Sequence, residues 1–353
     1  MKRTLTNVLF FLNIMVVSAL IISYFSVYIP PDKFWIPALF GLAFPFLAIG
    51  NIIFLVFWAF VKPRLLFLSL ITFLVGFGFH TRYFQIIGKH TKSEGVKVLS
   101  YNVKYFTGNG NVSQRESARR IVDFLNEQGA DIICLQETRL RKNDIFNLPE
   151  TVKNLKSVEH YQYARSSTTY GSVTMTRFPI LNMSEIRFEN TRNMSIYTDI
   201  LIDSDTVRVF NVHLQSYLID PRRYSIIESP GLDEEQDIKE MREMGSKYRL
   251  AVKLRAKQAR EIRKYIDESP YPVIVCGDFN DSPISYSYQK LRGNFNDAFV
   301  SSGHGLGRTY IGKLPSFRID NIFYSNNFES FNFQTLDFRM SDHLPVSCTL
   351  IKK

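Results

Sequence analysis

The fold is decided by the stretch Val273-Ile274-Val275-Cys276-Gly277-Asp278-Phe279-Asn280-Asp281. Its β-branched first half is typical of a strand that is covered on both faces, and Gly277 lets the chain turn sharply where the strand ends. Asp278 and Asn280 are therefore predicted to lie at the mouth of a sheet. The same residues are also compatible with an ordinary Asx turn, in which the side chains bond their own backbone.

Other predicted strands end on polar side chains in the same way. One acid, amide or imidazole per strand end is how a site is assembled from distant parts of a sequence. The strands and their polar neighbours are Val96–Ser100 with Asn102, Asp131–Leu135 with Glu137, Val207–Asn211 with His213, Arg318–Phe323 with Asp320, and Ser341-Asp342-His343 before Val346–Ile351. We therefore expect these side chains to converge on one site.

Helices alternate with strands over the C-terminal three quarters of the chain. Ser113–Gln128 is predicted to be an amphipathic helix, with Ser113 as its N-cap and Glu116 completing a capping box. A second helix, Lys247–Ile266, combines an apolar stripe with many Lys and Arg residues on its other faces. These basic residues indicate either a solvated face or contact with anionic lipid or nucleic acid. The irregular stretch Gln215–Ser246 is either a substrate-recognition loop or a mobile insertion.

Seven ordered motifs between Val96 and Leu350 resemble the endonuclease/exonuclease/phosphatase superfamily. They are Tyr101-Asn102, Leu135-Gln136-Glu137, Gly171 through Arg177-Phe178-Pro179-Ile180, Asn211-Val212-His213-Leu214, Gly277-Asp278-Phe279-Asn280, Arg318-Ile319-Asp320 and Ser341-Asp342-His343. The resemblance implies an α/β fold, a four-layer sandwich of two packed β-sheets flanked by helices. It also implies a divalent-metal-dependent hydrolase of phosphate esters, in which water attacks phosphorus.

Metal ligation follows from the kind of oxygen donors that are present. Mg²⁺ prefers carboxylate and carbonyl oxygens and keeps several waters, so Glu137 is the expected carboxylate ligand and Asn102 adds a neutral oxygen. The resemblance implies the same roles for both residues. Asp342 is expected to bind a second metal ion or to support the first. The expected cofactor is Mg²⁺, with Mn²⁺ as an alternative, and no other cofactor-binding residue is predicted.

The catalytic roles are those that the resemblance implies. Asp278 would orient or deprotonate the attacking water, and Asn280 would hold a phosphate oxygen. His343 would act as a general acid or contact the phosphate, with Asp320 accepting a hydrogen bond from its other nitrogen and keeping it protonated. His213 would give a further hydrogen bond to the phosphate.

The substrate stays open among nucleic acid, a lipid headgroup and a small phosphate ester. Abasic-site repair members of the superfamily usually carry a Tyr-x-Pro-Asn sequence where this chain has Asn211-Val212-His213-Leu214, and this departure argues against DNA repair. A lipid phosphodiesterase or a phosphomonoesterase is the main alternative. A binding protein on an inactive scaffold is disfavoured, because no expected catalytic position is missing. No protein partner is indicated.

The first quarter of the chain is strongly apolar. Two uncharged runs predict membrane helices at about 8–29 and 34–61. A third run, uncharged over Leu65–Phe79, predicts a membrane helix at about 65–87 with Arg82 near the interface. These helices would form a membrane anchor over residues 1–90 that precedes a catalytic domain at 96–351. A cleaved signal peptide and the buried helical hairpin of a soluble domain are the alternatives. A transporter is disfavoured, since the runs lack the intramembrane acids and bases that such pathways need.

Charge indicates an orientation and a class of partner. Lys2, Arg3, Lys62 and Arg64 would lie together on the cytoplasmic side of the cell membrane, so an odd number of spans places the catalytic domain outside the cytoplasm. The basic residues after the third run oppose this orientation. The chain carries a formal net charge of +10, of which residues 1–88 hold +5 (six basic residues less one acid), leaving a mild +5 for the rest. This is less than a dedicated duplex binder requires, but it suits anionic substrates.

Overall fold

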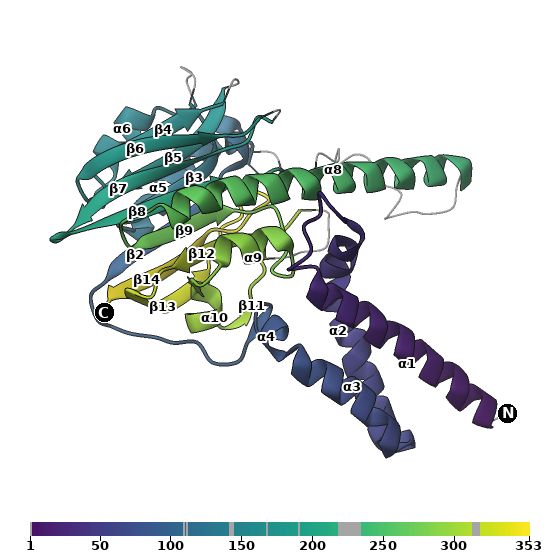
Figure 1. The fold of residues 1–353 in the computed structure, drawn as a ribbon. Helices are drawn as coiled ribbons and strands as arrows, with labels where there is room; N and C mark the ends of the chain where they lie inside the picture. Colours follow the sequence, from purple (N-terminus) through teal and green to yellow (C-terminus); the bar gives the residue numbers. More distant parts are fainter. Residues whose placement is uncertain are drawn as a thin grey trace.

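The computed structural model describes residues 2–108, 110, 112–140, 145–166, 169–189, 191–217, 234–312 and 318–353. Figure 1 shows two parts: a domain of two sheets with helices, and a bundle of three helices at the N-terminal end that projects from it. We call residues 96–353 the two-sheet domain. The helical bundle is α1 (Lys2–Phe25), α2 (Ile36–Val61) and α3 (Pro63–Val75).

Each of the two large sheets has six strands. The first has the order β13 (Phe328–Thr335), β14 (Val346–Lys352), β2 (Val96–Asn102), β3 (Ile132–Arg139), β5 (Tyr170–Thr176) and β4 (His160–Arg165). The second has the order β10 (Asn296–Asp297), β12 (Asp320–Tyr324), β9 (Val273–Asp278), β8 (Asp205–His213), β7 (Met194–Ile202) and β6 (Ile180–Arg187). The pairs β2–β3 and β8–β9 are parallel and the other neighbours are antiparallel.

Helices cover the outer face of each sheet, so the predicted four-layer sandwich is confirmed. The apolar layer between the sheets contains Cys134, Val209, Ile274 and Cys276, which are fully buried. On the outer face of the first sheet lie α5 (Gln114–Gln128) and α6 (Leu148–Asn154), and on that of the second lie α8 (Glu234–Asp267) and α9 (Tyr286–Arg292). Shorter elements are η1 (Lys104–Phe106), α10 (Ala298–Ser302), and a small antiparallel pair, β1 (Phe84–Gln85) with β11 (Gly305–Leu306).

The helix boundaries follow local chemistry. The Ser113 hydroxyl accepts a hydrogen bond from the backbone N–H of Glu116 at 3.2 Å, which confirms the predicted N-cap of α5. The prediction for α8 was wrong at its start, because the helix begins at Glu234 instead of Lys247. Residues 234–246 are rich in Glu, Lys, Arg and Met, which are good helix formers and outweigh the irregular charge pattern. The rest of that predicted irregular stretch, residues 218–233, lies outside the described residues.

The helical bundle contains α1 (Lys2–Phe25), α2 (Ile36–Val61) and α3 (Pro63–Val75). Among the described residues, two helices are long and apolar enough to cross a membrane, Thr4–Phe25 and Ile36–Val61. The predicted third membrane helix at 65–87 was wrong, since α3 has 13 residues and ends at Gly76, before the single turn α4 (Phe77–His80). A side chain at Gly76 would collide with Tyr24, whose hydroxyl lies 2.1 Å from the position of a Cβ atom.

The chain after α4 enters the two-sheet domain instead of continuing through a membrane. The guanidinium of Arg82 is buried and donates to the backbone oxygen of Pro283 at 3.0 Å and to Oε1 of Gln289 at 2.9 Å. Arg318 donates in turn to the backbone oxygen of Arg82 at 3.1 Å and pairs with buried Asp297 at 2.7 Å. Buried charges of this kind are tolerated only when they are paired, so this cluster fixes how the two parts join.

Loss of the Arg318–Asp297 pair should destabilise the whole chain. Arg318→Met would leave Asp297 as a buried, unpaired carboxylate, and we expect the free energy of unfolding to fall by roughly 3–5 kcal/mol. Denaturant titration of the full chain in detergent measures this change. Arg339→Met is the matched control, because Arg339 and its partner Asp337 are largely exposed and their pair should contribute little. Equal losses in both variants would contradict the assignment.

Candidate active site

The end of β9 is shaped by an unusual backbone. Gly277 has φ +138°, and a Cβ atom there would lie 2.0 Å from the backbone oxygen of Val212 on β8. Asp278 follows and is 1% exposed. Its Oδ1 accepts from the backbone N–H of Asn280 at 2.8 Å, so the Asx turn is present. Its Oδ2 accepts from the side-chain amides of Asn280 and Asn102, each at 2.9 Å, so the carboxylate also reaches across to the other sheet.

Strand pairing brings the predicted strand ends together. In the second sheet His213 lies opposite Asp278 in the parallel pair β8–β9, and Asp320 lies opposite Asp278 in the antiparallel pair β9–β12. In the first sheet Asn102 lies opposite Gln136 in the parallel pair β2–β3. Because the sheets pack face to face, these ends meet at one edge of the sandwich.

Two imidazoles flank Asp278. The Nε2 atoms of His213 and His343 each lie 3.8 Å from Asp278 Oδ2. Nδ1 of His343 lies 3.0 Å from Oδ2 of Asp320, and Nε2 of His213 lies 3.4 Å from Oε1 of Glu137. The arrangement is thus a central carboxylate with a carboxylate–imidazole pair on either side.

The protonation of His343 depends on its carboxylate neighbours. Burial lowers the pKa of this imidazole, but the charges of Asp320 and Asp278 outweigh burial and raise the pKa to about 10. Burial is also the main reason that the pKa of Asp278 rises to about 6, a rise that the two imidazoles limit. At neutral pH His343 is therefore a cation beside an ionised Asp278.

Glu137 is presented by a local distortion of β3. The pairing of β3 with β5 shifts register between Leu135 and Thr138, and Glu137 adopts φ +53°, which is rare for a side chain of this size. Burial acts to raise the pKa of Glu137, but the close interaction with the His213 imidazole holds it below the ordinary value. Although burial lowers the pKa of His213, the interaction with Glu137 raises it overall.

Asp342 and Asn280 have partners that the sequence did not predict. Asp342 forms an ion pair with Lys104, whose Nζ lies 2.8 Å from Oδ2. The side-chain nitrogen of Asn280 donates to the backbone oxygen of Leu214 at 3.0 Å as well as to Asp278, so both amide hydrogens are used. Of the eight predicted residues, seven lie around the Asp278 carboxylate or its imidazole neighbours, and Asp342 is turned toward Lys104.

The neighbouring η1 turn supplies residues that sequence reasoning missed. Lys104 and Tyr105 have positive φ angles of 42° and 57°, and Tyr105 hydrogen-bonds Glu137 through its side chain. Both residues follow Asn102 within three positions. Their closeness to a predicted strand end is the sequence feature that could have identified them as site residues. Gln136 and Asn211 form a second missed feature, a buried bond of 2.8 Å between the two sheets.

The donor set fits a hard divalent cation. Glu137 offers a carboxylate, and Asn102 Oδ1 accepts one hydrogen bond, from the backbone N–H of Lys104, which leaves a lone pair. Nε2 of His213 is buried and makes no hydrogen bond of good geometry, although Oε1 of Glu137 lies 3.4 Å away. Among the described residues, Asp278, Asp320 and His343 also form a close group. We favour Glu137 with Asn102, because Asp320 is occupied by His343 and Asp278 already accepts three hydrogen bonds.

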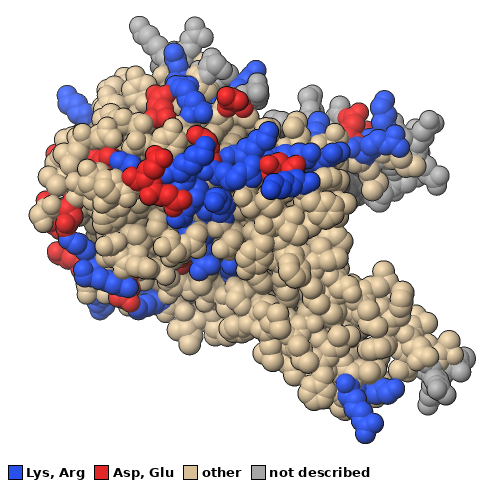
Figure 2. Space-filling view, in the orientation of Figure 1, with Lys and Arg blue, Asp and Glu red and all other residues tan. Residues whose placement is uncertain are grey.

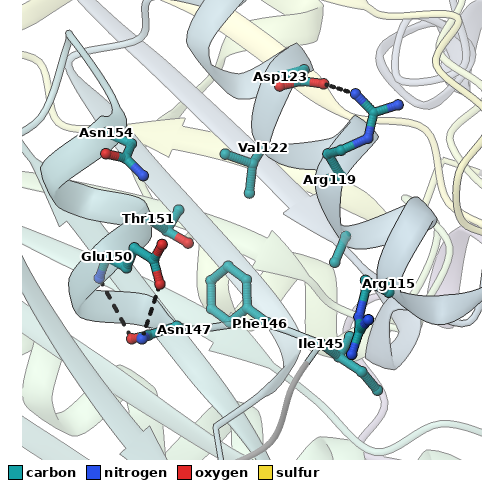
Figure 3. A pocket seen from close by; sticks show the side chains of 11 residues that line it. Arg115, Arg119, Val122, Asp123, Ile145, Phe146, Asn147, Glu150, Thr151 and Asn154 are labelled. Carbon is teal, nitrogen blue, oxygen red and sulfur yellow. Dashed lines mark hydrogen bonds and ion pairs between the residues drawn. The ribbon is translucent and has the colours of Figure 1, made fainter.

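A pocket of about 630 Å³ opens onto this site. Glu137 and His213 line it, together with Tyr105, Arg192 and two leucines of α8, Leu250 and Leu254. A second pocket, of about 430 Å³, lies between α5 and the segment 145–154. Figure 3 shows its polar groups pairing with one another, Asn147 with Glu150 and Arg119 with Asp123. No predicted site residue lines this second pocket.

Comparison with known proteins shows the family and the fold of the two-sheet domain. A model of the endonuclease/exonuclease/phosphatase family matches residues 99–343, and a model described as a domain of unknown function matches residues 6–83. The chain is similar to the solved structure of an endonuclease/exonuclease/phosphatase from Beutenbergia cavernae, with 15% identity over 74% of this chain and 72% of that one, at a TM-score of 0.53. TDP2 from Caenorhabditis elegans gives 17% identity, 73% and 74% coverage, and a TM-score of 0.51. An endonuclease/exonuclease/phosphatase family protein from Leptotrichia buccalis is 14% identical over 72% of this chain and 99% of that one, with a TM-score of 0.50. No curated protein matches, and at these identities the solved structures show the fold.

The protonation of His343 can be measured directly. We expect nitrogen NMR of the imidazole to show it protonated up to pH about 10. Asp320→Asn removes the nearest negative charge and should move this titration to lower pH, since the cation loses its stabilising partner. Asp337→Asn, a change at an exposed carboxylate, is the control and should leave the titration in place. The interpretation fails if both variants titrate like the wild type.

Proposed function

The chain belongs to the endonuclease/exonuclease/phosphatase family, since the family model matches more than half of its residues, and we propose that it is a membrane-anchored, metal-dependent hydrolase. Members of this family hydrolyse phosphate esters and depend on divalent metal ions. The observation that carries the proposal is the position of Asp278, a buried carboxylate within 3.8 Å of two imidazoles and within hydrogen-bonding distance of Asn102.

Glu137 and Asn102 are the residues that we assign to a Mg²⁺ ion, or to Mn²⁺ in its place. A bound divalent ion neutralises phosphoryl oxygens and favours deprotonation of a water nucleophile. The lowered pKa of Glu137 keeps its carboxylate available as a ligand at neutral pH. Asp342, paired with Lys104, is assigned a supporting role on the same side of the site.

Asp278 is the proposed acceptor of the proton from the attacking water. Its pKa of about 6 makes it ionised at neutral pH but still basic enough to take a proton. Asn280 uses both amide hydrogens on Asp278 and the backbone, so we assign it to positioning Asp278 instead of to the phosphate. His343, held protonated by Asp320, then supplies positive charge or a proton to the phosphate ester, and His213 supplies a further N–H.

Metal-dependent turnover is the direct test of this mechanism. The purified chain in detergent should hydrolyse at least one of plasmid DNA, a phosphodiester lipid and a phosphomonoester with Mg²⁺, and lose that activity with EDTA. Asp278→Asn should lower kcat by about 10²–10⁴-fold, because general-base assistance is worth that much. Asp337→Asn is the matched control at an exposed position and should retain activity.

The opposite outcome would favour a binding protein on an inactive scaffold. In that case no substrate would turn over with either cation, and Asp278→Asn would leave the chain's biological activity intact.

The helical bundle supports membrane anchoring. In the most apolar windows of α1 and α2 only 28% and 22% of residues are buried, whereas the core helix of a soluble protein would be mostly buried. On the face seen in Figure 2, the side of the bundle between its two ends carries no charged residues. A cleaved signal peptide is disfavoured, because Asn13 on α1 bonds to Trp58 and Ser69, and Ser26 donates to the backbone oxygen of Ile284 in the two-sheet domain.

The direction of the helices supports the proposed orientation. The end of α1 and the start of α2 contact the two-sheet domain, through Ser26 and Asp32, so the N-terminus and the turn at Lys62 lie at the opposite end of the bundle. The basic residues at that end are typical of the cytoplasmic side. We therefore propose that the chain resides in the cell membrane with the two-sheet domain outside the cytoplasm.

Cysteine labelling in intact cells tests this orientation. Lys353→Cys places a thiol on the exposed C-terminus, and we expect a membrane-impermeant maleimide to label it without permeabilisation. Lys62→Cys, at the opposite end of the bundle, should be labelled only after permeabilisation. The native cysteines Cys134, Cys276 and Cys348 are buried and should not react. The reverse labelling pattern would place the domain in the cytoplasm.

A further inference from the structure

We propose that the site takes a phosphate ester carrying an aliphatic chain, which it draws from the bilayer surface along α8. This inference rests on the proposed function and names its substrate class. It follows from three features of α8: its apolar contribution to the pocket, its contact with the start of the membrane helices, and the exposed apolar face of its N-terminal half.

The first feature is the wall of the pocket at the site. Leu250 and Leu254 project from successive turns of α8 into the same pocket as Glu137 and His213. Leu250 remains 50% exposed, so it offers apolar surface that no described residue covers. Among the described lining residues Arg192 is the single Lys or Arg, whereas a polynucleotide needs several phosphate contacts to bind. A pocket with polar residues at the site and leucine side chains along one side suits an amphiphilic substrate better than a polynucleotide.

The second feature places this wall at the membrane boundary. The Tyr248 hydroxyl donates to the backbone oxygen of Ala38 in the first turns of α2 at 2.7 Å, and the Arg249 guanidinium lies 5.8 Å from the ring centre of Trp35. Arg260 pairs with Asp32 in the turn between α1 and α2 through two bonds, of 2.8 and 3.0 Å. Tryptophan beside an apolar helix is typical of the membrane–water interface.

The distance that a substrate would have to travel is therefore short. Tyr248, Arg249 and Leu250 are consecutive, so one turn of α8 contacts the membrane helices on one side and lines the pocket on the other. A helix with its side chains is about 10–12 Å across. The headgroup layer on each side of a bilayer is about 5–8 Å thick, so a phosphate in the pocket lies close to the level of the headgroups.

The third feature is the N-terminal half of α8. Ile238 and Met241 are 60% and 65% exposed. Met241 precedes Tyr248 by seven residues, about two helical turns, and therefore points to the side on which Tyr248 contacts α2. Arg242 and Arg249 repeat at the same interval beside this apolar strip. Figure 1 shows this half of α8 projecting past the two-sheet domain, and Figure 2 shows Lys and Arg gathered along α8.

Lys239 and Arg242 flank Ile238 and Met241, but Glu240 and Glu243 lie on the same segment, so this half of α8 is not basic overall. Its exposed apolar residues suit the headgroup boundary, and attraction to anionic lipid would come from the basic residues that follow along α8, such as Lys247, Arg249 and Lys253. Placed next to the pocket, the strip would keep the pocket mouth at the surface from which an aliphatic phosphate ester enters.

Chain-length dependence of binding tests the proposal. The probes are butyl phosphate and octyl phosphate, titrated calorimetrically with Mg²⁺ into the full chain in phosphatidylcholine nanodiscs. We expect the ratio of the butyl to the octyl dissociation constant to be about tenfold larger for the wild type than for Leu250→Asp, because buried methylene groups contribute to the octyl complex only. Partition of octyl phosphate into the nanodisc is common to both proteins and cancels.

Leu181→Asp is the matched control, since Leu181 is 55% exposed on β6 and does not line the pocket. It should keep the wild-type ratio. Binding of butyl phosphate by Leu250→Asp shows that the variant has folded, and Leu254→Asn replaces it if that binding is lost. A ratio that is the same in the wild type and the pocket variant would overturn the proposal. So would a short oligonucleotide that displaces butyl phosphate more strongly than octyl phosphate does.

The amphiphile proposal and the proposed hydrolase function can be rejected independently of each other. Chain-length dependence without turnover would retain the amphiphile site and reject the hydrolase. Turnover without chain-length dependence would retain the hydrolase and reject a bilayer-derived substrate.

Discussion

The structure depends on keeping the buried carboxylate of Asp278 ionised. Burial alone opposes this charge and raises its pKa, and the surrounding groups limit the rise to about 6. Those groups come from both sheets: Asn102 from the first, and His213 from the second, with His343 from the segment before β14. A shift of one residue in any of these strands would turn its side chain to the opposite face. The register of the sandwich is therefore part of the chemistry of the site.

The two imidazoles are alike in distance from Asp278 but differ in their second partner. His343 is backed by Asp320 at full burial, whereas His213 is backed by Glu137, which lies at the pocket. With both imidazoles protonated, the three carboxylates and two cations sum to one negative charge. Such a balance attracts a cation toward the exposed side of the cluster, where Glu137 lies. With Glu137 as a metal ligand, His213 would be free to hydrogen-bond a phosphate oxygen.

Sequence patterns predicted the strand ends because the residues that matter follow apolar runs directly. They could not predict which side chains touch, since that depends on register and on the packing of one sheet on the other. Two contacts result from that packing. Lys104 pairs with Asp342, and Asn280 donates both of its amide hydrogens, to Asp278 and to the backbone oxygen of Leu214. The prediction of a third membrane helix failed because the apolar run is divided at Gly76, where α3 ends and the single turn α4 begins. The start of α8 was predicted too late because its first residues are mostly charged. From the sequence alone, such helix formers are hard to distinguish from an irregular polar segment.

The loop that follows Asp278 is held jointly by the helical bundle, by Arg82 and by α8. Asp281 pairs with fully buried Arg255 of α8, the backbone oxygen of Pro283 accepts from Arg82, and Ile284 packs among Leu20, Tyr24 and Phe44 of the bundle. Five residues lie between the carboxylate of Asp278 and Ile284, which makes this apolar contact. A loop held at both ends in this way leaves little freedom for the site to turn relative to α1 and α2. The pocket consequently keeps one position with respect to any membrane that these helices cross, which is the geometric condition for taking a substrate from its surface.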